Sequence, residues 1–121
     1  FEALSGRARS GGVASTRGNP TQMQGWLTKE GGIIRSWRRR WCVLASRRLY
    51  YFDGFDARTR ELRGTVPIDR FCTVKRLSER PFGFAISCPR AERVYKMCAD
   101  NERAAQAWAK AIQEAIDVDA E

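Results

Sequence analysis

The most informative segment of the chain is Gly25-Trp-Leu-Thr-Lys29-Glu-Gly-Gly-Ile-Ile-Arg35-Ser-Trp-Arg-Arg-Arg40-Trp41. Its two ends alternate like β-strands, and Gly31-Gly32 forms a turn between them. The turn and the strand ends beside it carry several cations. Glycine leaves backbone N–H groups accessible, and the cations offset negative charge. The segment therefore predicts a basic hairpin suited to a ligand with several phosphates.

The positive charge of the chain is concentrated in its middle. The 121 residues are enough for one domain, and their formal net charge is +8. Residues 21–99 hold 17 basic and 7 acidic side chains, whereas residues 100–121 hold 2 basic and 6 acidic ones. Such a basic field favours polyanionic partners, namely nucleic acid, an anionic membrane surface or phosphorylated ligands.

Short strand patterns recur from about Met23 onward, and one helical pattern follows them. Residues 1–20, rich in Gly, Ser and Arg, predict a flexible linker. Residues 21–118 predict the ordered domain and residues 119–121 an acidic tail. The expected strands are Met23–Lys29, Trp37–Ala45, Arg48–Asp53, Leu62–Ile68, Phe71–Arg76, Phe82–Ser87 and Arg93–Cys98.

The helical pattern begins near Asp100, which is a suitable N-cap, and it presents Trp108 and Ile112 on its apolar face. Seven strands followed by a single helix indicate a mainly β domain. We expect a seven-stranded antiparallel sandwich or partly open barrel, capped by the C-terminal amphipathic helix, with Trp108 as a core anchor.

Strand alternation sorts the cations by face. Lys29 is in phase with Leu27, Arg38 and Arg40 are in phase with Leu44, and Tyr51 is in phase with Leu49. If the three leucines face the core, the cations and Tyr51 continue that inner face. A closed core does not tolerate unpaired charges, so the sheet would splay into a cationic cup there. The alternative is that residues 38–40 form an ordinary solvated basic strand.

Ile33 and Ile34 follow the glycines at the tip of the basic turn. Two adjacent large aliphatic residues favour a tip that enters lipid, where each contributes on the order of 1 kcal/mol when partly buried. The alternative is that they pack onto Trp37.

The composition argues against catalysis and against a metal or cofactor site. The chain has no His, no phosphate-binding Walker motif and no nucleophile motif. Its four cysteines, Cys42, Cys72, Cys88 and Cys98, form no CxxC pair. They predict free buried thiols in a reducing cytosol.

The same segment, followed by Leu49-Tyr-Tyr51-Phe52 and Arg63-Gly64 and later by Trp108, resembles a pleckstrin homology (PH) domain. The resemblance covers about residues 22–118. Within that family it is most similar to cytohesin-type and related domains, which read 3-phosphorylated inositides. It implies a non-catalytic module that binds phosphatidylinositol 3,4,5-trisphosphate, phosphatidylinositol 3,4-bisphosphate or both. Such a module is cytoplasmic and is recruited peripherally to the plasma membrane or to endomembranes.

The resemblance also implies a role for each matching residue. Lys29 and Arg40 would contact the 3- and 4-phosphates, and Arg38 would add charge near the 5-position. Tyr51 would donate its hydroxyl to the 4-phosphate region, and Arg63 would reach the 3-phosphate. The sixth site residue, Arg35, would lie on the first loop near the headgroup.

Two features depart from the cytohesin pattern. Glu30 places a carboxylate beside Lys29, although alternation should turn it outward. The connection from Cys88 to Glu92 is short, whereas cytohesin-type domains carry an extra hairpin there that engages the 5-phosphate. The short connection predicts weaker discrimination at the 5-position.

A protein partner and nucleic acid are the other two partner classes that a basic domain can bind. A domain of this fold can instead be a protein-interaction or scaffolding module with weak, non-selective binding to anionic lipid. Arg47, Arg48, Arg58 and Arg60, which lie outside the cup, could serve such a contact. Nucleic acid is not favoured, because the aromatic residues fit strand-core phases and no RNA-binding signature is present.

Overall fold

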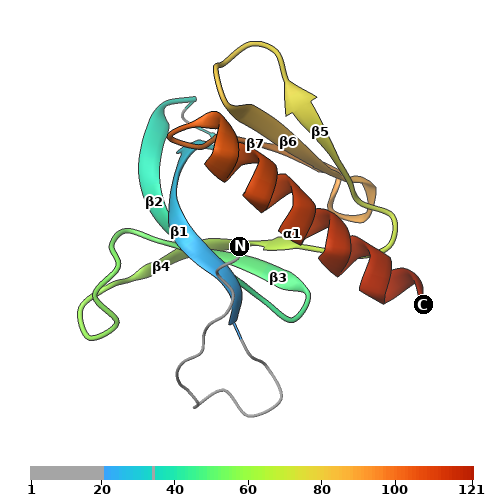
Figure 1. Ribbon diagram of the computed structural model, residues 1–121. Helices are drawn as coiled ribbons and strands as arrows, with labels where there is room; N and C mark the ends of the chain where they lie inside the picture. The colour runs from blue at the N-terminus through green and yellow to red at the C-terminus, as the bar shows by residue number, and fades with distance from the viewer. Residues whose placement is uncertain (1–20, 34) are drawn as a thin grey trace.

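The domain consists of seven antiparallel strands and one C-terminal helix, as the sequence predicts (Figure 1). The computed structural model describes residues 21–33 and 35–121, so the expected linker (residues 1–20) and Ile34 lie outside the described residues. The elements are β1 (Thr21–Glu30), β2 (Trp37–Ala45), β3 (Arg48–Phe52), β4 (Leu62–Pro67), β5 (Thr73–Leu77), β6 (Gly83–Cys88), η4 (Pro89–Ala91), β7 (Arg93–Cys98) and α1 (Glu102–Ala120).

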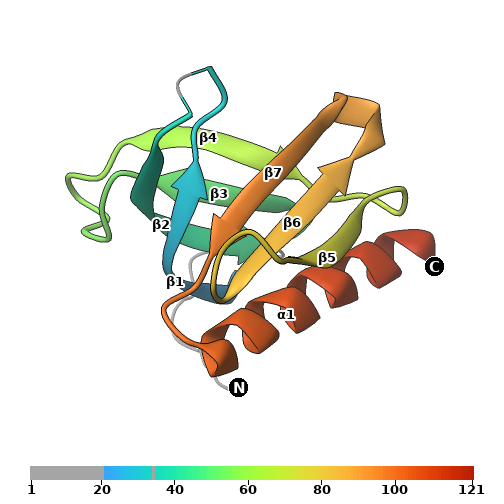
Figure 2. The ribbon, with the colours of Figure 1, turned by 90° about the horizontal axis from the view of Figure 1, so that it is seen from above.

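The sheet is continuous but does not close. Its strand order is β4-β3-β2-β1-β7-β6-β5. Consecutive strands pair except β4 and β5, which lie at opposite edges, and the two halves are joined by the pairing of β1 with β7. β1 pairs with β7 through only two register positions, Thr28↔Cys98 and Lys29↔Met97. The sheet therefore divides into two halves, β4-β3-β2-β1 and β7-β6-β5, which are joined at the C-terminal part of β1. Figure 2 shows the two halves facing each other.

The core lies between the two halves and is covered along one side by α1. Leu27, Leu44 and Leu49 from the first half are fully buried, as are Ile86 and Met97 from the second. The helix adds Trp108, Ile112 and Ile116 at helical spacing. The Trp108 ring lies against Gly25 of β1, because a Cβ on that glycine would be 3.7 Å from Cζ2. Trp108 is thus the core anchor that the sequence predicts.

The start of α1 differs from the expectation by one residue. Asn101, not Asp100, is the N-cap: its backbone is extended and its Oδ1 accepts a hydrogen bond from the N–H of Ala104 at 2.8 Å. Asp100 instead binds the guanidinium of Arg39 on β2 with both carboxylate oxygens, at 2.9 and 3.1 Å. Asp100, which local propensity assigns to the N-cap, therefore forms a tertiary ion pair with Arg39 instead.

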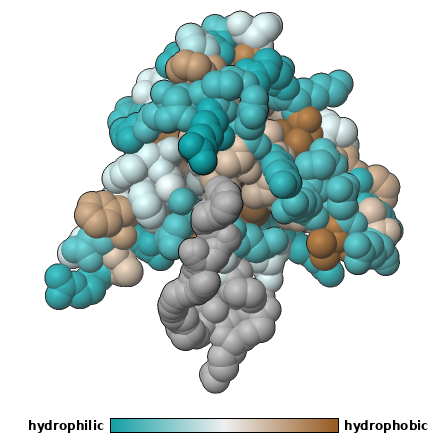
Figure 3. Space-filling model, in the orientation of Figure 1, coloured by the Kyte–Doolittle hydropathy of each residue, from teal (hydrophilic) through white to brown (hydrophobic). Residues whose placement is uncertain are grey.

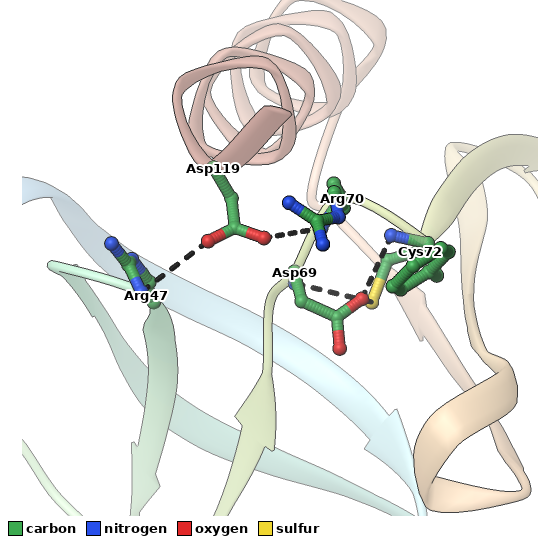
Figure 4. A network of polar contacts seen from close by, with 6 residues as sticks. Arg47, Asp69, Arg70, Cys72 and Asp119 are labelled. Atoms are coloured by element: carbon green, nitrogen blue, oxygen red, sulfur yellow. Dashed lines mark hydrogen bonds and ion pairs between the residues drawn. The ribbon is translucent and has the colours of Figure 1, made fainter. Parts of the chain in front are cut away.

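The last turn of α1 is fixed to two loops by Asp119, a residue that the sequence places in the acidic tail (Figure 4). Its Oδ1 lies 3.3 Å from the guanidinium of Arg47 in the β2–β3 turn. Its Oδ2 accepts a hydrogen bond from the backbone N–H of Arg70 in the β4–β5 loop at 2.7 Å. The helix therefore extends through this position and links both halves of the sheet.

The four cysteines are free and buried, as predicted. Burial raises the pKa of Cys42 to about 12, although Lys29 and Arg40 partly oppose that shift. Burial also raises the pKa of Cys72 and of Cys88, whose Sγ atoms lie 3.4 Å apart. Because these shifts favour the thiol form at neutral pH, Cys42, Cys72 and Cys88 act as small core side chains.

Replacing Trp108 with alanine should remove the largest buried side chain in the core. We expect Trp108→Ala to lower the free energy of unfolding by about 3–5 kcal/mol, because the lost contacts leave a cavity. Urea unfolding followed by circular dichroism measures this change. Val118→Ala on the exposed side of α1 is the control and should change stability by less than about 0.5 kcal/mol. Equal effects of the two substitutions would contradict the anchoring role of Trp108.

Candidate functional site

Lys29 is a buried charged residue at the upper end of β1. Its side chain is 5% exposed, and its register partner is Arg38 on β2. The Nζ atom donates to the carbonyl oxygen of Glu30 at 3.1 Å and lies 4.4 Å from the centre of the Tyr51 ring. An ammonium group has three donors. Among the described residues the Glu30 carbonyl is its single acceptor, so two N–H bonds remain for another partner.

The surroundings of Lys29 disfavour its charge. Burial lowers the pKa of Lys29 below its ordinary value, and the positive charges of Arg93 and Arg40 lower it further. The weakest contribution comes from Glu30, which raises the pKa slightly. A lysine that is both desolvated and surrounded by like charge gains from a bound anion, because the anion supplies the counter-charge that the protein lacks.

The cations of β2 lie on the face predicted from strand alternation. Leu27 is opposite Arg40 and Lys29 is opposite Arg38, so these side chains share the inner face with the core. Arg40 is half-buried, and Arg38 is exposed with its Nε donating to the Ser36 hydroxyl at 3.2 Å. The three arginines at positions 38–40 therefore do not form a uniformly solvated basic strand.

Arg39 lies on the opposite, outer face of the sheet. It is paired with Asp100, and its guanidinium carbon lies 5.0 Å from the centre of the Trp26 ring. Its charge is thus already compensated and directed away from Lys29. This contrast with Arg40, one residue along the same strand, follows from the two-residue period of a strand.

The position of Tyr51 depends on a glycine in the neighbouring strand. Tyr51 pairs with Gly64 of β4, and a Cβ atom at Gly64 would overlap the hydroxyl and the Cζ atom of Tyr51. The missing side chain lets the Tyr51 ring lie across β4 while remaining close to Lys29. This close contact explains sterically why glycine follows Arg63 in the Arg63-Gly64 pair of the family pattern.

Arg63 and Arg35 lie near this region but do not contact Lys29 in the part of the chain that the structure describes. Arg63 is exposed and is the extra residue where the β3–β4 register shifts between Tyr51 and Phe52. Arg35 is exposed in the β1–β2 loop, with its guanidinium 4.0 Å from the Glu30 carboxylate. That carboxylate therefore faces Arg35, while Lys29 bonds to the carbonyl oxygen of the same residue.

Two residues of β7 complete the site, and the sequence did not identify them. Tyr95 is buried with its ring centre 5.6 Å from the Lys29 Nζ, and Arg93 lies over that ring at 4.5 Å. The guanidinium of Arg93 also reaches the β1–β2 loop, because a Cβ at Gly32 would be 2.9 Å from one of its nitrogens. We use the name cup for the set Lys29, Arg38, Arg40, Tyr51, Arg93 and Tyr95.

The sequence of β7 indicates which way Arg93 and Tyr95 face, but not which strand lies beside them. Arg93, Tyr95 and Met97 alternate in phase, and Met97 is in the core, so alternation places Arg93 on the inner face. The pairing of β7 with β1 is a long-range contact that alternation does not reveal. Without that pairing, Arg93 could not be assigned to the same end of the domain as Lys29.

The remaining predicted feature is the loop tip. Ile33 is 99% exposed, so it does not pack onto Trp37. The guanidinium of Arg80 covers the Trp37 ring instead, at 3.9 Å from its centre. Two surface hollows are lined by residues outside the cup. One, of about 510 Å³, is lined by Ala45–Arg48 and Tyr50, and the other, of about 460 Å³, is lined by Phe71, Pro89 and Arg90.

Comparison with known proteins places this geometry in a family. The mouse protein "Differentially expressed in FDCP 6" is 39% identical over 99 residues, which cover 81% of this chain and 15% of that protein. Mouse cytohesin-4 is 37% identical over 65 residues, 54% of this chain and 16% of its own length. The chain therefore spans a small part of these relatives.

A solved structure agrees with the sequence relatives. The C-terminal PH domain of pleckstrin, solved in complex with D-myo-Ins(1,2,3,4,5)P5, is 28% identical with a TM-score of 0.65. The match covers 80% of this chain and 99% of that one. The family profile of the PH domain matches residues 21–117. A PH domain is a non-catalytic binding module. With the unclosed seven-stranded sheet and the capping helix, these matches show that the chain belongs to the PH domain family.

Proposed function

We propose that residues 21–118 form a phosphoinositide-binding module that recruits its parent protein to membranes. The observation that carries the proposal is Lys29, a buried ammonium with one acceptor among the described residues and with arginines around it. An inositol headgroup with adjacent phosphates supplies both the missing acceptors and the counter-charge. The inositol phosphate bound to the pleckstrin domain in its solved structure supports this ligand class.

The arrangement of cations favours a headgroup phosphorylated at the 3- and 4-positions. In this proposal Lys29 and Arg40 hold the 3- and 4-phosphates, and the Tyr51 hydroxyl donates to the 4-phosphate region. Arg63 approaches the 3-phosphate from β4. Each charge-assisted contact of this kind contributes roughly 1.5–3 kcal/mol.

The 5-position is less enclosed. Arg38 and the newly identified Arg93 flank it, while the three-residue η4 takes the place of a longer connection between β6 and β7. With a short connection, few additional groups can distinguish an occupied 5-position from an empty one. We therefore propose that the module accepts both the 3,4-bisphosphate and the 3,4,5-trisphosphate. Arg35 contributes charge from the β1–β2 loop at the edge of the binding site.

The exposed loop tip provides the apolar part of the membrane contact. A side chain such as Ile33 that is almost fully exposed gains free energy by entering lipid. Within the described residues, the structure contains no helix of the length and apolarity needed to cross a membrane. We propose peripheral recruitment from the cytoplasm to the plasma membrane or to endomembranes, through the cup and the tip together.

A second candidate function is a protein-interaction or scaffolding role. It is favoured by an aromatic cluster on the outer face of β1 and β2, where the rings of Trp26, Trp41 and Phe55 lie 5.3–6.3 Å apart. Phe55 is 64% exposed, and the buried Trp41 Nε1 has no hydrogen-bond partner among the described residues. A partner on this face would leave the cup free, so the two functions are compatible.

Binding to inositide-containing vesicles tests the primary function. We expect Lys29→Met and Arg40→Ala each to weaken binding at least about tenfold, because each removes a charge-assisted phosphate contact. Arg39→Ala is the matched control: it removes the same charge one residue away but from the outer face. Its binding should stay within about twofold of the unmodified domain in a sedimentation assay. If Arg39→Ala and Arg40→Ala were equally impaired, bulk charge and not the cup would explain binding.

The burial of Lys29 predicts that the site costs stability. Its lowered pKa means that the folded state disfavours the charged form, so Lys29→Met should raise the free energy of unfolding at neutral pH. The unfolded chain binds the proton more tightly, so the unmodified domain should gain stability as pH rises from the lowered pKa toward 10.5. Urea unfolding of both proteins across that window measures the difference. A less stable Lys29→Met would show that the ammonium stabilises the unbound fold.

The tip should affect membrane binding without affecting headgroup binding. We expect Ile33→Ser to lower vesicle affinity about fivefold, from the loss of on the order of 1 kcal/mol of apolar burial in lipid. Calorimetric titration with soluble inositol 1,3,4,5-tetrakisphosphate should give the same affinity as the unmodified domain. A parallel loss in both assays would mean that Ile33 supports the cup instead of entering lipid.

A further inference from the structure

The hollow lined by Phe71, Pro89 and Arg90 has the composition of a binding surface for an amphiphilic anion. Phe71 belongs to the β4–β5 loop and is 48% exposed, and Arg90 belongs to η4. The hollow measures about 460 Å³ and contains none of the cup residues. It combines an accessible aromatic ring, a proline ring and a guanidinium.

Two arginines flank the exposed ring. The guanidinium carbons of Arg70 and Arg90 each lie 5.2 Å from the centre of the Phe71 ring. Neither forms an ion pair with a carboxylate in residues 21–33 or 35–121, in contrast to Arg39 and Arg47. A cation over an exposed ring contributes only about 0.5–1 kcal/mol, so both guanidinium groups retain donors for an anion.

The loop that presents Phe71 is held by hydrogen bonds from three consecutive backbone N–H groups. The N–H of Arg70 donates to Asp119, that of Phe71 to the Asp69 Oδ1 at 2.9 Å, and that of Cys72 to the Asp69 carbonyl oxygen at 3.1 Å (Figure 4). Asp69 is the carboxylate on this loop, and its Oδ1 is occupied by the Phe71 N–H. The exposure of Phe71 is thus built into an ordered loop.

The hollow lies at the same end of the domain as the cup. Cys72 and Cys88, whose Sγ atoms touch, join its two walls, and Arg90 is three residues before the cup residue Arg93. Figure 2 shows the β6–β7 connection, which contains η4, and the β1–β2 loop on the side of the molecule away from α1, whereas the β4–β5 loop lies beside the C-terminal end of α1. A membrane that delivers a headgroup to the cup would therefore approach the hollow from its η4 wall.

The view in Figure 3 shows a mainly hydrophilic surface with separate hydrophobic patches. Because exposed apolar side chains are interspersed with charge, a single one such as Phe71 needs flanking cations to favour an anionic partner. Arg70 and Arg90 supply that charge complementarity. Phosphate and carboxylate oxygens fit the guanidinium fork, and the phenyl ring fits the glycerol and upper acyl region.

We infer that this hollow is a second membrane contact, which binds an anionic glycerophospholipid without inositol, such as phosphatidylserine, beside the headgroup held in the cup. The inference rests on the proposed function, because the cup orients this end of the domain toward the bilayer. Arg70 and Arg90 bind the lipid's phosphate and carboxylate, and Phe71 contacts its apolar part.

Vesicles with a fixed small fraction of inositide and an increasing fraction of phosphatidylserine test the inference. Affinity of the unmodified domain should rise with phosphatidylserine, and Arg70→Ala/Arg90→Ala should bind at least tenfold more weakly at the highest fraction, since each charge near an anionic surface contributes about a fivefold factor. Phe71→Ala should lose several-fold. The control is Arg103→Ala/Lys110→Ala on exposed positions of α1, which removes the same charge from the helix, on the side opposite the β6–β7 connection and the β1–β2 loop in Figure 2.

The control should stay within about twofold, and all variants should bind soluble inositol tetrakisphosphate as the unmodified domain does. The inference is overturned if Arg70→Ala/Arg90→Ala behaves like the control, or if it loses soluble headgroup binding. Inositide-free vesicles separate it from the proposed function. There, a failure of the cup removes the inositide effect, while the difference between the two double variants still reports on the hollow.

Discussion

The alternation of side chains along β1 and β2 is the constraint on which the rest of the site depends. The register that buries Leu27 also places Lys29, Arg38 and Arg40 on the same inner face, because directly opposed residues of an antiparallel pair share a face. The hydrophobic core therefore passes into a cluster of cations without a break in the strands. A slip of β2 by one residue would put Arg39 in place of Arg40 on the inner face and would turn the buried Leu44 of the same strand outward. Core packing and the orientation of the cations are thus maintained by the same hydrogen bonds.

The side of the sandwich covered by α1 and the end that carries the cup differ in how well their polar groups are paired. Along one side, α1 buries Trp108 and Ile112 and is tied to two loops by Asp119. At the cup end, the ammonium of Lys29 is desolvated and is left with few protein acceptors. The contacts of α1 thus stabilise one side of the domain, while the cup keeps an unfavourable charge arrangement. Functional sites commonly carry such a cost, and the surrounding core offsets it.

The elements of the domain were largely predictable because strands and helices have local periods. The seven strands were found within one or two residues, and the apolar stripe of α1 identified Trp108. Local propensity failed at Asp100, because Arg39 on a distant strand recruits it and leaves Asn101 to cap the helix. It also missed the role of Asp119, whose partners lie 49 and 72 residues away in the chain. In both cases a long-range polar contact outweighed a local preference.

The residues of the candidate site also divide into those that local periodicity predicts and those that depend on long-range contacts. Alternation was sufficient to place Lys29, Arg38, Arg40 and Tyr51 on one inner face, because each lies on a strand whose inner face is marked by its own buried residues. Arg93 and Tyr95 join them only through the pairing of β7 with β1, and the walls of the Phe71 hollow meet through the contact of Cys72 with Cys88. Periodicity within a segment specifies which way a side chain faces, whereas chain folding specifies which segments are neighbours. The sequence therefore determined the sign and the face of the charges, and the tertiary structure decided which of them lie together.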